Sequence, residues 1–317
     1  MTETSPESVG VCVDVCVYVC TYRRNEALAR LLDSLQVAAK AASPAARLAV
    51  VVVDDNPDRG AEQVVAESAA VFPLGLHYRF VGAGNIAIAR NAGLEAAMAL
   101  APWVAMVDDD QVVVPEWLSE LLRVQREHDA DAVTAPVYAR FGADAPDWIR
   151  DQPFADLWCT PVKADGASVT DLQTANSLIS TEFLEANPEV RFAADLGEAG
   201  GEDMVFYRMA LDAGLKAHYS HHAVNWEIEP RERATYRYQL RRNLWHGNTE
   251  AVTNLRAGRD SRVRLLARAA KRGVVAAGHP IRQRRAGDPP EWRYTFAYSL
   301  QSVGMILGAA GVVLRHG

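Results

Sequence analysis

Short apolar runs alternate with longer segments of helical periodicity through the first half of the chain, and this alternation constrains the fold most. The apolar runs are VCVDVCVYVC, LAVVVVDD, LHYRFV and WVAMVDDD. Two of them are almost continuously apolar, as in strands that have helices on both faces. Repeated strand–helix units predict an α/β fold with a mostly parallel sheet flanked by helices, joined by right-handed crossovers.

Polar residues follow three of these runs, at the point where each predicted strand ends. The segments are CTYRR, DDNP and VDDDQ. The carboxyl ends of parallel strands share one edge of a sheet, and open α/β sheets bind ligands outside that edge. The three segments therefore predict one binding site.

Three consecutive carboxylates, Asp108, Asp109 and Asp110, end the fourth run. Like charges repel, so their crowding needs an opposing charge, and hard oxygen ligands favour Mg²⁺ or Mn²⁺. In an extended segment Asp108 and Asp110 point one way and Asp109 the other. The sequence predicts a divalent cation here, and a solvated acidic turn is the alternative.

Charge and cysteine usage restrict the partners and the compartment. The net charge of −7 argues against a nucleic-acid partner. Cys12, Cys16 and Cys20 are spaced four apart in one predicted strand, which separates neighbours by roughly 13 Å. That distance is too long for a disulfide or a shared metal. We expect reduced core thiols and a cytoplasmic protein.

Six motifs in order carry a family resemblance. They are CTYRR, VVVVDDNP, the GAGNIAIARN segment, VDDDQVVVPEWLSELL, GGEDMVF and RRNLWHGN. Together they resemble family 2 glycosyltransferases of the GT-A fold, and more specifically bacterial exopolysaccharide transferases of the succinoglycan type. The resemblance covers roughly residues 11–250.

The resemblance implies a Rossmann-like GT-A catalytic domain over residues 11–250, with a nucleotide-binding half (11–115) and an acceptor half (116–250). Residues 1–10 are expected to form a disordered tail, and residues 251–317 a basic and apolar helical C-terminal extension. The implied activity is inverting and metal-dependent transfer from a nucleotide sugar, expected to be UDP-linked, to a hydroxyl group. A lipid-linked saccharide, a polysaccharide or a natural product would be the acceptor.

The resemblance also implies which residues bind the donor. Tyr22 would lie by the base, Asp55 would accept a hydrogen bond from it, and Arg90 would approach the phosphates. Asp110 would be the main ligand of Mn²⁺ or Mg²⁺, with Asp108 close to the metal. The implied donor-binding residues are Cys20, Thr21, Tyr22, Asp54, Asp55, Arg90, Asp108, Asp109 and Asn176. Packing, surface or helix-capping roles are the alternatives for Tyr22, Arg90, Asp54 and Asp55.

The segment GEAGGEDMVF supplies a candidate general base. Its glycines allow a tight turn, and Glu202 and Asp203 follow at a predicted helix start, where backbone N–H groups favour anions. The resemblance maps the base to Asp203 and a supporting role to Glu202. Simple capping of the helix is the alternative. His221 or His222 could supply a further metal ligand, and Trp226 and Trp245 could stack on a sugar, although ordinary polar and core roles are favoured.

Three other functions compete with this interpretation. The pattern Gly82-x-Gly84-x-x-Ala87 imitates a dinucleotide-binding fingerprint, so an NAD-dependent oxidoreductase is one alternative. Asp109 and Asp110 would then have no role. A nucleotidyltransferase would share the fold and the acidic site, but it would release pyrophosphate. A sugar-binding module without catalysis would release no nucleotide.

The end of the chain permits three placements. Residues 297–314 are apolar but contain Ser, Gln and Gly, and an arginine-rich segment precedes them. A basic segment of this kind suits the anionic inner face of the plasma membrane, so peripheral membrane contact is one expectation. A helix packed within the protein and a homodimer interface are the others, and a true span is disfavoured.

Overall fold

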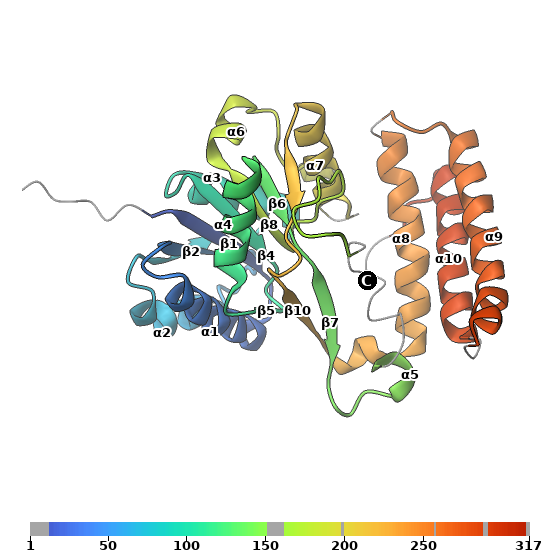
Figure 1. Ribbon diagram of the computed structural model, residues 1–317, viewed down its shortest axis with the longest axis horizontal. Coiled ribbons are helices and arrows are strands. Elements are labelled where there is room, and N and C mark those ends of the chain that lie inside the picture. Colours follow the sequence, from blue (N-terminus) through green and yellow to red (C-terminus); the bar gives the residue numbers. More distant parts are fainter. Residues whose placement is uncertain (1–12, 151–161, 198–199, 257, 288–290, 315–317) are drawn as a thin grey trace, which may run out of the picture.

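The computed structural model describes residues 13–150, 162–197, 200–256, 258–287 and 291–314. The expected tail at residues 1–10, together with Cys12 and Cys159, lies outside this part of the chain. Within the described residues an α/β domain stands beside a layer of three helices (Figure 1).

The α/β domain is built on a seven-stranded sheet in the order β3-β2-β1-β4-β8-β6-β9. Neighbouring strands are parallel except around β8, which is antiparallel to both β4 and β6. The fold is therefore a mostly parallel α/β sheet, as the sequence predicts. The strands are β1 (Val15–Thr21), β2 (Leu48–Asp54), β3 (Leu76–Phe80), β4 (Trp103–Val107), β6 (Ala132–Thr134), β8 (Asn176–Ser180) and β9 (Ala217–Tyr219).

Helices cover both faces of this sheet because successive strand side chains point to opposite sides. Val17 and Val19 of β1 share one core with the leucines of the first helix, whereas Cys16 and Tyr18 belong to the core on the other face. The helices on the first face are α1 (Asn25–Ala42), α2 (Glu62–Ser68) and α4 (Trp117–His128). Those on the second are α3 (Ile86–Met98), α6 (Thr181–Ala186) and α7 (Glu202–Asp212).

A second, three-stranded sheet extends the acidic end of β4. Its order is β5 (Gln111–Val113), β10 (Asn225–Glu229), β7 (Val137–Phe141). The β5 strand begins directly after the three aspartates, and the Ile228 N–H donates to the Asp110 carbonyl oxygen at 2.9 Å. This sheet therefore brings β10, more than a hundred residues later in the chain, against the acidic segment.

Three long helices form the layer at the right of Figure 1: α8 (Tyr236–Arg256), α9 (Arg262–Ala286) and α10 (Trp292–Ala309). The expected domain boundary at residue 250 falls inside α8. The α8 and α10 backbones approach closely at glycines, because a Cβ on Gly304 would lie 1.9 Å from the Leu244 carbonyl oxygen. None of the helices in the described ranges is both long enough and apolar enough to cross a membrane.

Four short helical turns complete the described part of the chain. They are η1 (Ala69–Val71), α5 (Asp147–Arg150), η2 (Ala194–Leu196) and η3 (Arg231–Ala234). The η3 turn matters for the site, because it links β10 to α8 and carries an arginine toward the acidic segment.

Candidate active site

A cavity of about 740 Å³ lies where the ends of β1, β2 and β4 meet β10 and α8. The three polar strand ends that the sequence places on one rim all border it. The lining residues are Cys20, Thr21, Tyr22, Arg24, Asp55, Gly84, Ile86, Asp108, Asp109, Asp110, Gly197, Glu227, Arg233, Tyr238, Arg242, Trp245 and His246.

Arginine and hydroxyl partners offset the crowding of the three aspartates. Asp109 accepts from Thr21 Oγ1 at 2.8 Å and from Arg24 Nη1 at 2.9 Å, so both of its oxygens are satisfied. Asp110 Oδ2 accepts from Arg24 at 2.8 Å, and Asp108 Oδ1 accepts from Arg90 at 3.4 Å. Asp108 Oδ2 and Asp110 Oδ1 accept no hydrogen bond from the described residues.

The pKa values of these carboxyls are raised, so their arginine and hydroxyl partners do not fully offset burial and mutual repulsion. Burial raises the pKa of Asp108, of Asp109 and of Asp110, and neighbouring carboxylates add to the rise. Arg24 and Arg90 act in the opposite direction because their positive charge favours the ionised forms. A further cation near the unsatisfied oxygens would relieve the remaining repulsion.

The helix α7 begins at Glu202, as the sequence predicts, after Gly200 and Gly201 with φ of +79° and +92°. These angles favour glycine. Glu202 is buried and forms an ion pair with Arg90, which also reaches Asp108.

Asp203 lies at the start of the same helix and is half-buried. Its Oδ1 accepts from the Met204 N–H at 2.8 Å, and its Oδ2 accepts nothing from the described residues. Its negative charge contributes, after burial, to the raised pKa values of Asp108 and Glu202.

Asp54, the last residue of β2, and Asp55, which follows it, differ in how they are used. Asp54 accepts from the Asn56 and Ala61 N–H groups and from the Tyr78 hydroxyl, so its carboxylate is fully engaged in the loop. Asp55 borders the cavity, and its Oδ1 accepts from the backbone N–H groups of Ala83 and Gly84 at 2.7 and 3.1 Å.

These same N–H groups belong to the GxGxxA pattern of the dinucleotide-binding alternative. In a dinucleotide fingerprint the glycine-rich turn approaches the pyrophosphate. Here the Asp55 carboxylate, an anion supplied by the protein itself, already occupies the Ala83 and Gly84 N–H groups. The turn is thus used to fix Asp55, which disfavours the oxidoreductase.

Five of the predicted site residues do not line this cavity or the smaller one beside it: Asp54, Arg90, Asn176, Glu202 and Asp203. Arg90, Glu202 and Asp203 lie behind Asp108. Asn176, in contrast, lies in the core. Its buried amide accepts from Trp117 Nε1 and donates to the carbonyl oxygens of Pro136 and Ala223, so its groups are engaged within the protein.

His221 and His222 contact each other edge to face and do not border the cavity. Trp226 packs against Tyr138 and Arg140 and does not border it either. Trp245 does border it.

A second group of charged residues joins the site from β10, η3 and α8. Arg233 Nη1 donates to Glu227 at 3.0 Å and to Glu229 at 3.1 Å, and Arg242 Nη1 donates to Glu229 at 2.6 Å. Burial, followed by the negative charge of Asp110, raises the pKa of Glu227 to about 7. The RRNLWHGN motif marks Arg242 and Trp245, but no sequence signal marks Glu227 or Arg233.

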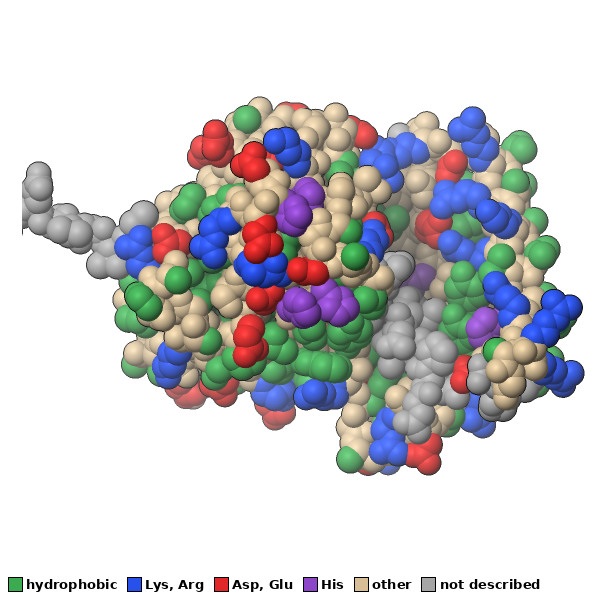
Figure 2. Space-filling view, in the orientation of Figure 1, with side chains coloured by type: hydrophobic (Ala, Val, Ile, Leu, Met, Phe, Trp, Pro, Cys, Tyr) green, Lys and Arg blue, Asp and Glu red, His purple; other side chains and the backbone are tan. Residues whose placement is uncertain are grey.

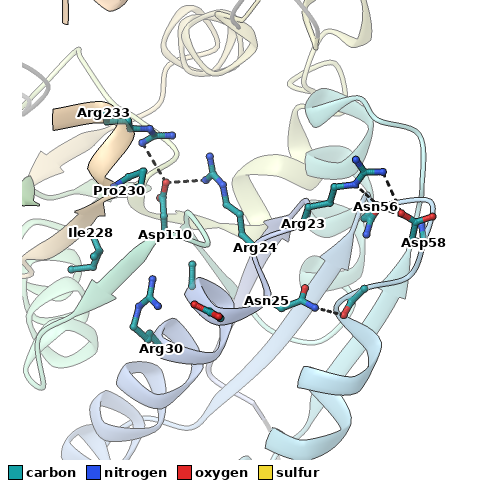
Figure 3. A pocket seen from close by; sticks show the side chains of 13 residues that line it. Arg23, Arg24, Asn25, Arg30, Asn56, Asp58, Asp110, Ile228, Pro230 and Arg233 are labelled. Atoms are coloured by element: carbon teal, nitrogen blue, oxygen red, sulfur yellow. Dashed lines mark hydrogen bonds and ion pairs between the residues drawn. The ribbon is translucent and has the colours of Figure 1, made fainter. Parts of the chain in front are cut away.

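A neighbouring cavity of about 630 Å³ lies on the other side of Asp110 (Figure 3). Arg24 and Arg233 both turn toward the Asp110 carboxylate, at 2.8 and 3.6 Å, and this ion-paired group borders both cavities. Arg23 turns away to Asn56 and Asp58.

The donor set suits a cation that uses few protein ligands. Among the residues the structure describes, no three His, Cys, Asp or Glu side chains converge to hold a metal ion. Mg²⁺ typically takes one or two carboxylates and completes its shell with phosphates and water. Asp108 and Asp110 each retain one oxygen for such an ion.

Comparisons with known proteins show similarities in family and in fold. The family model described as Glycosyl transferase family 2 matches residues 16–186. The chain is 35% identical over 247 residues to the succinoglycan biosynthesis protein ExoM of Rhizobium meliloti (strain 1021), covering 78% of this chain and 74% of that protein.

Solved structures of S. aureus TarS share the fold. TarS 1–349 in complex with UDP aligns with a TM-score of 0.54 and 18% identity, over 96% of this chain and 93% of that one. The complex with UDP-GlcNAc gives 0.54 and 16%, with the same coverage. A longer TarS chain gives 0.55 and 17% over 90% of this chain, which spans only 55% of its length.

Proposed function

The chain belongs to glycosyl transferase family 2, and from this premise we propose that it is an inverting, metal-dependent enzyme acting on a UDP-linked sugar. The observation that carries the proposal is the cavity where three strand ends meet α8. It combines two half-satisfied carboxylates with arginines from separate elements. That combination suits a diphosphate held through a cation on one side and through guanidinium groups on the other.

Residues of the β1 and β2 ends would bind the nucleotide. Tyr22 is 45% exposed at the rim of the cavity and offers a ring for stacking on the base. Asp55 is fixed through its Oδ1, which leaves Oδ2 to accept from a base N–H group. UDP is favoured because TarS, which shares the fold, is known in complexes with UDP and UDP-GlcNAc.

Asp108 and Asp110 would hold Mn²⁺ or Mg²⁺ through their unsatisfied oxygens. When bound, the cation would offset negative charge on the departing diphosphate. Asp109 is left as a support, because Thr21 and Arg24 already occupy both of its oxygens. Arg233 and Arg242 line the same cavity, paired with carboxylates of β10, and would place their guanidinium groups near the diphosphate.

Asp203 would act as the general base. Its Oδ2 would take the proton of the acceptor hydroxyl as that oxygen attacks the anomeric carbon, and the bond from that carbon to the diphosphate breaks with inversion. Glu202 would position the start of α7 through its ion pair with Arg90. Asp203 is the better candidate of the two because Glu202 is buried and already paired.

A saccharide is the proposed acceptor, either lipid-linked or part of a growing polysaccharide. The support is the similarity to a protein of succinoglycan biosynthesis, which covers most of both chains. Trp245 and Tyr238 line the cavity on its α8 side and offer apolar ring surface to a sugar.

Product identity tests this function. The full chain is incubated with UDP-sugars and saccharide acceptors, with Mn²⁺ or with a chelator, and the released nucleotide is measured. We expect UDP release that needs both the acceptor and the metal. Pyrophosphate release would indicate a nucleotidyltransferase instead, and donor binding without any release would indicate a sugar-binding module.

A further inference from the structure

The helix α9 carries an unusual concentration of positive charge. Its 25 residues include eight Arg or Lys and no Asp or Glu, in a protein whose net charge is −7. Only Arg268 and Arg272 form ion pairs within the described residues, both with Glu250 and the first also with Asp260. Figure 2 shows this charge gathered over the helical layer at the right of the molecule.

Apolar side chains run along the outer side of the same helix. Val263, Val274 and Ile281 are 75%, 74% and 57% exposed. Their spacings of eleven and seven residues correspond to about three and two helical turns, so they form one line roughly 27 Å long. Arg264, Lys271 and Arg282 are exposed and run beside this line, with spacings of seven and eleven residues.

The helix α10 adds a second exposed apolar line. Trp292 and Phe296 are 61% and 55% exposed, and Val303 and Ile306 are 44% and 46% exposed. The four residues recur at helical spacing on the side of α10 opposite Met305, which is buried. Aromatic side chains of this kind favour the headgroup region of a bilayer.

We propose that this outer face of α9 and α10 docks the protein on an anionic lipid surface. Interfacial helices combine a basic polar face with exposed Val, Ile, Phe and Trp side chains, and they bind through apolar burial and attraction to anionic headgroups. A second copy of the chain is a poorer occupant, because pairing two α9 helices would place unpaired arginines against each other without any carboxylate on either helix.

Docking in this way would place the candidate active site close to the lipid surface. The α8 helix contributes Arg242, Trp245 and His246 to the cavity and packs against α10 through Gly247 and Gly304. One layer of helix therefore separates the docking face from the cavity. The inference itself does not depend on the donor or on the reaction, since none of the docking residues lines either cavity.

Vesicle co-sedimentation of the full chain tests the inference. We expect binding to vesicles containing about one-third phosphatidylglycerol, little binding to pure phosphatidylcholine, and weakening as NaCl rises from about 50 to 500 mM. Arg264→Gln with Lys271→Gln should lower the partition coefficient about 30-fold, because each basic residue near an anionic surface contributes about a factor of five. Val274→Ser with Ile281→Ser should lower it as well, since apolar burial is lost.

Lys40→Gln with Arg126→Gln is the matched control, because it removes the same charge from exposed positions of α1 and α4. It should leave binding unchanged. If both charge variants lost vesicle binding equally, the loss would follow from net charge alone, and the proposal would be overturned. Equal binding to neutral vesicles, or no binding, would also overturn it. So would self-association that Val274→Ser with Ile281→Ser abolishes, which would make the face a homodimer interface.

Discussion

At the scale of single residues, the carboxylates of the site differ in how many of their oxygens accept hydrogen bonds from the protein. Asp54 and Asp109 have both oxygens engaged. Asp108, Asp110 and Asp203 each keep one oxygen that accepts nothing from the described residues. Asp108, Asp110 and Asp203 are half-buried, so a ligand or a cation can reach the oxygens that lack a protein partner. The saturated carboxylates therefore serve as scaffold, and the half-satisfied ones are the candidates for contact with substrate or metal.

Asp203→Asn tests the role proposed for the base. The amide oxygen can still accept from the Met204 N–H, but it cannot take a proton, so the start of α7 should persist. We expect turnover to fall by roughly 10²–10⁴-fold, the usual contribution of a general base, with donor affinity changed little. Nucleotide release and donor titration measure the two effects separately.

Asp212→Asn, at the other end of the same helix, is the control. It removes an exposed carboxylate that pairs with Arg259, far along α7 from the cavity, and it should leave turnover unchanged. Near wild-type turnover in Asp203→Asn would remove Asp203 from the mechanism and make Glu227 the next candidate, because it lines the cavity and its pKa is raised to about 7.

At the scale of elements, the sequence predicts the long, regular strands and helices and misses the short strands. The alternation of apolar runs and helical segments predicts β1 to β4 and the helices between them. It gives no direction for β8 and no sign of β5, β6 or β9, which have three residues each and therefore no readable period.

The candidate site likewise combines residues that the sequence predicts with residues that it does not predict. Asp108, Asp109 and Asp110 stand together in the sequence, and the ordered motifs bring Tyr22, Asp55 and Arg90 into the prediction. Arg24 ends the CTYRR motif but receives no role from it, and Glu227 and Arg233 have no sequence signal. Arg24 and Asp110 are 86 residues apart, and Arg233 reaches Asp110 only because η3 follows β10. Pairings of this kind arise from tertiary packing, which single-sequence patterns do not record.

The glycine contact between α8 and α10 carries a prediction at this scale. A Cβ on Gly304 would overlap the Leu244 carbonyl oxygen, so Gly304→Ala forces the two helices apart. We expect a loss of about 1–3 kcal/mol in unfolding free energy, typical of overpacking, and weaker donor binding because α8 carries Arg242 and Trp245. Denaturant titration and donor titration measure these effects.

Gly278→Ala in α9 is the matched control, because a Cβ there would contact nothing within 4 Å. Alanine is the better helix former, so this change should be neutral or should stabilise the protein by up to about 1 kcal/mol. If both variants behaved alike, the α8–α10 approach would not be what holds α8 against the cavity.

At the scale of the whole molecule, the cavity joins the two layers of the protein. The strand ends provide its acidic side, and α8 provides Arg242, Trp245 and His246 on the other. A ligand that bridges these walls binds the folded, assembled molecule better than either layer alone. It should therefore raise the unfolding free energy of the whole molecule, and substituting a group that the ligand contacts should lower this increase.

Metal-dependent stabilisation by the donor is the prediction at this scale. With a UDP-sugar at about 100 times its Kd, binding should add about 2.7 kcal/mol to the unfolding free energy, which raises the melting temperature by about 4 °C. Mn²⁺ should supply part of this gain through Asp108 and Asp110. Asp110→Asn should remove the Mn²⁺-dependent part and keep the metal-free part, because Arg24 can still bond to the amide oxygen.

Asp33→Asn, an exposed change on α1, should behave as wild type in the same thermal scan. An equal Mn²⁺ increment in Asp110→Asn and wild type would show that the cation does not bind at the acidic strand end.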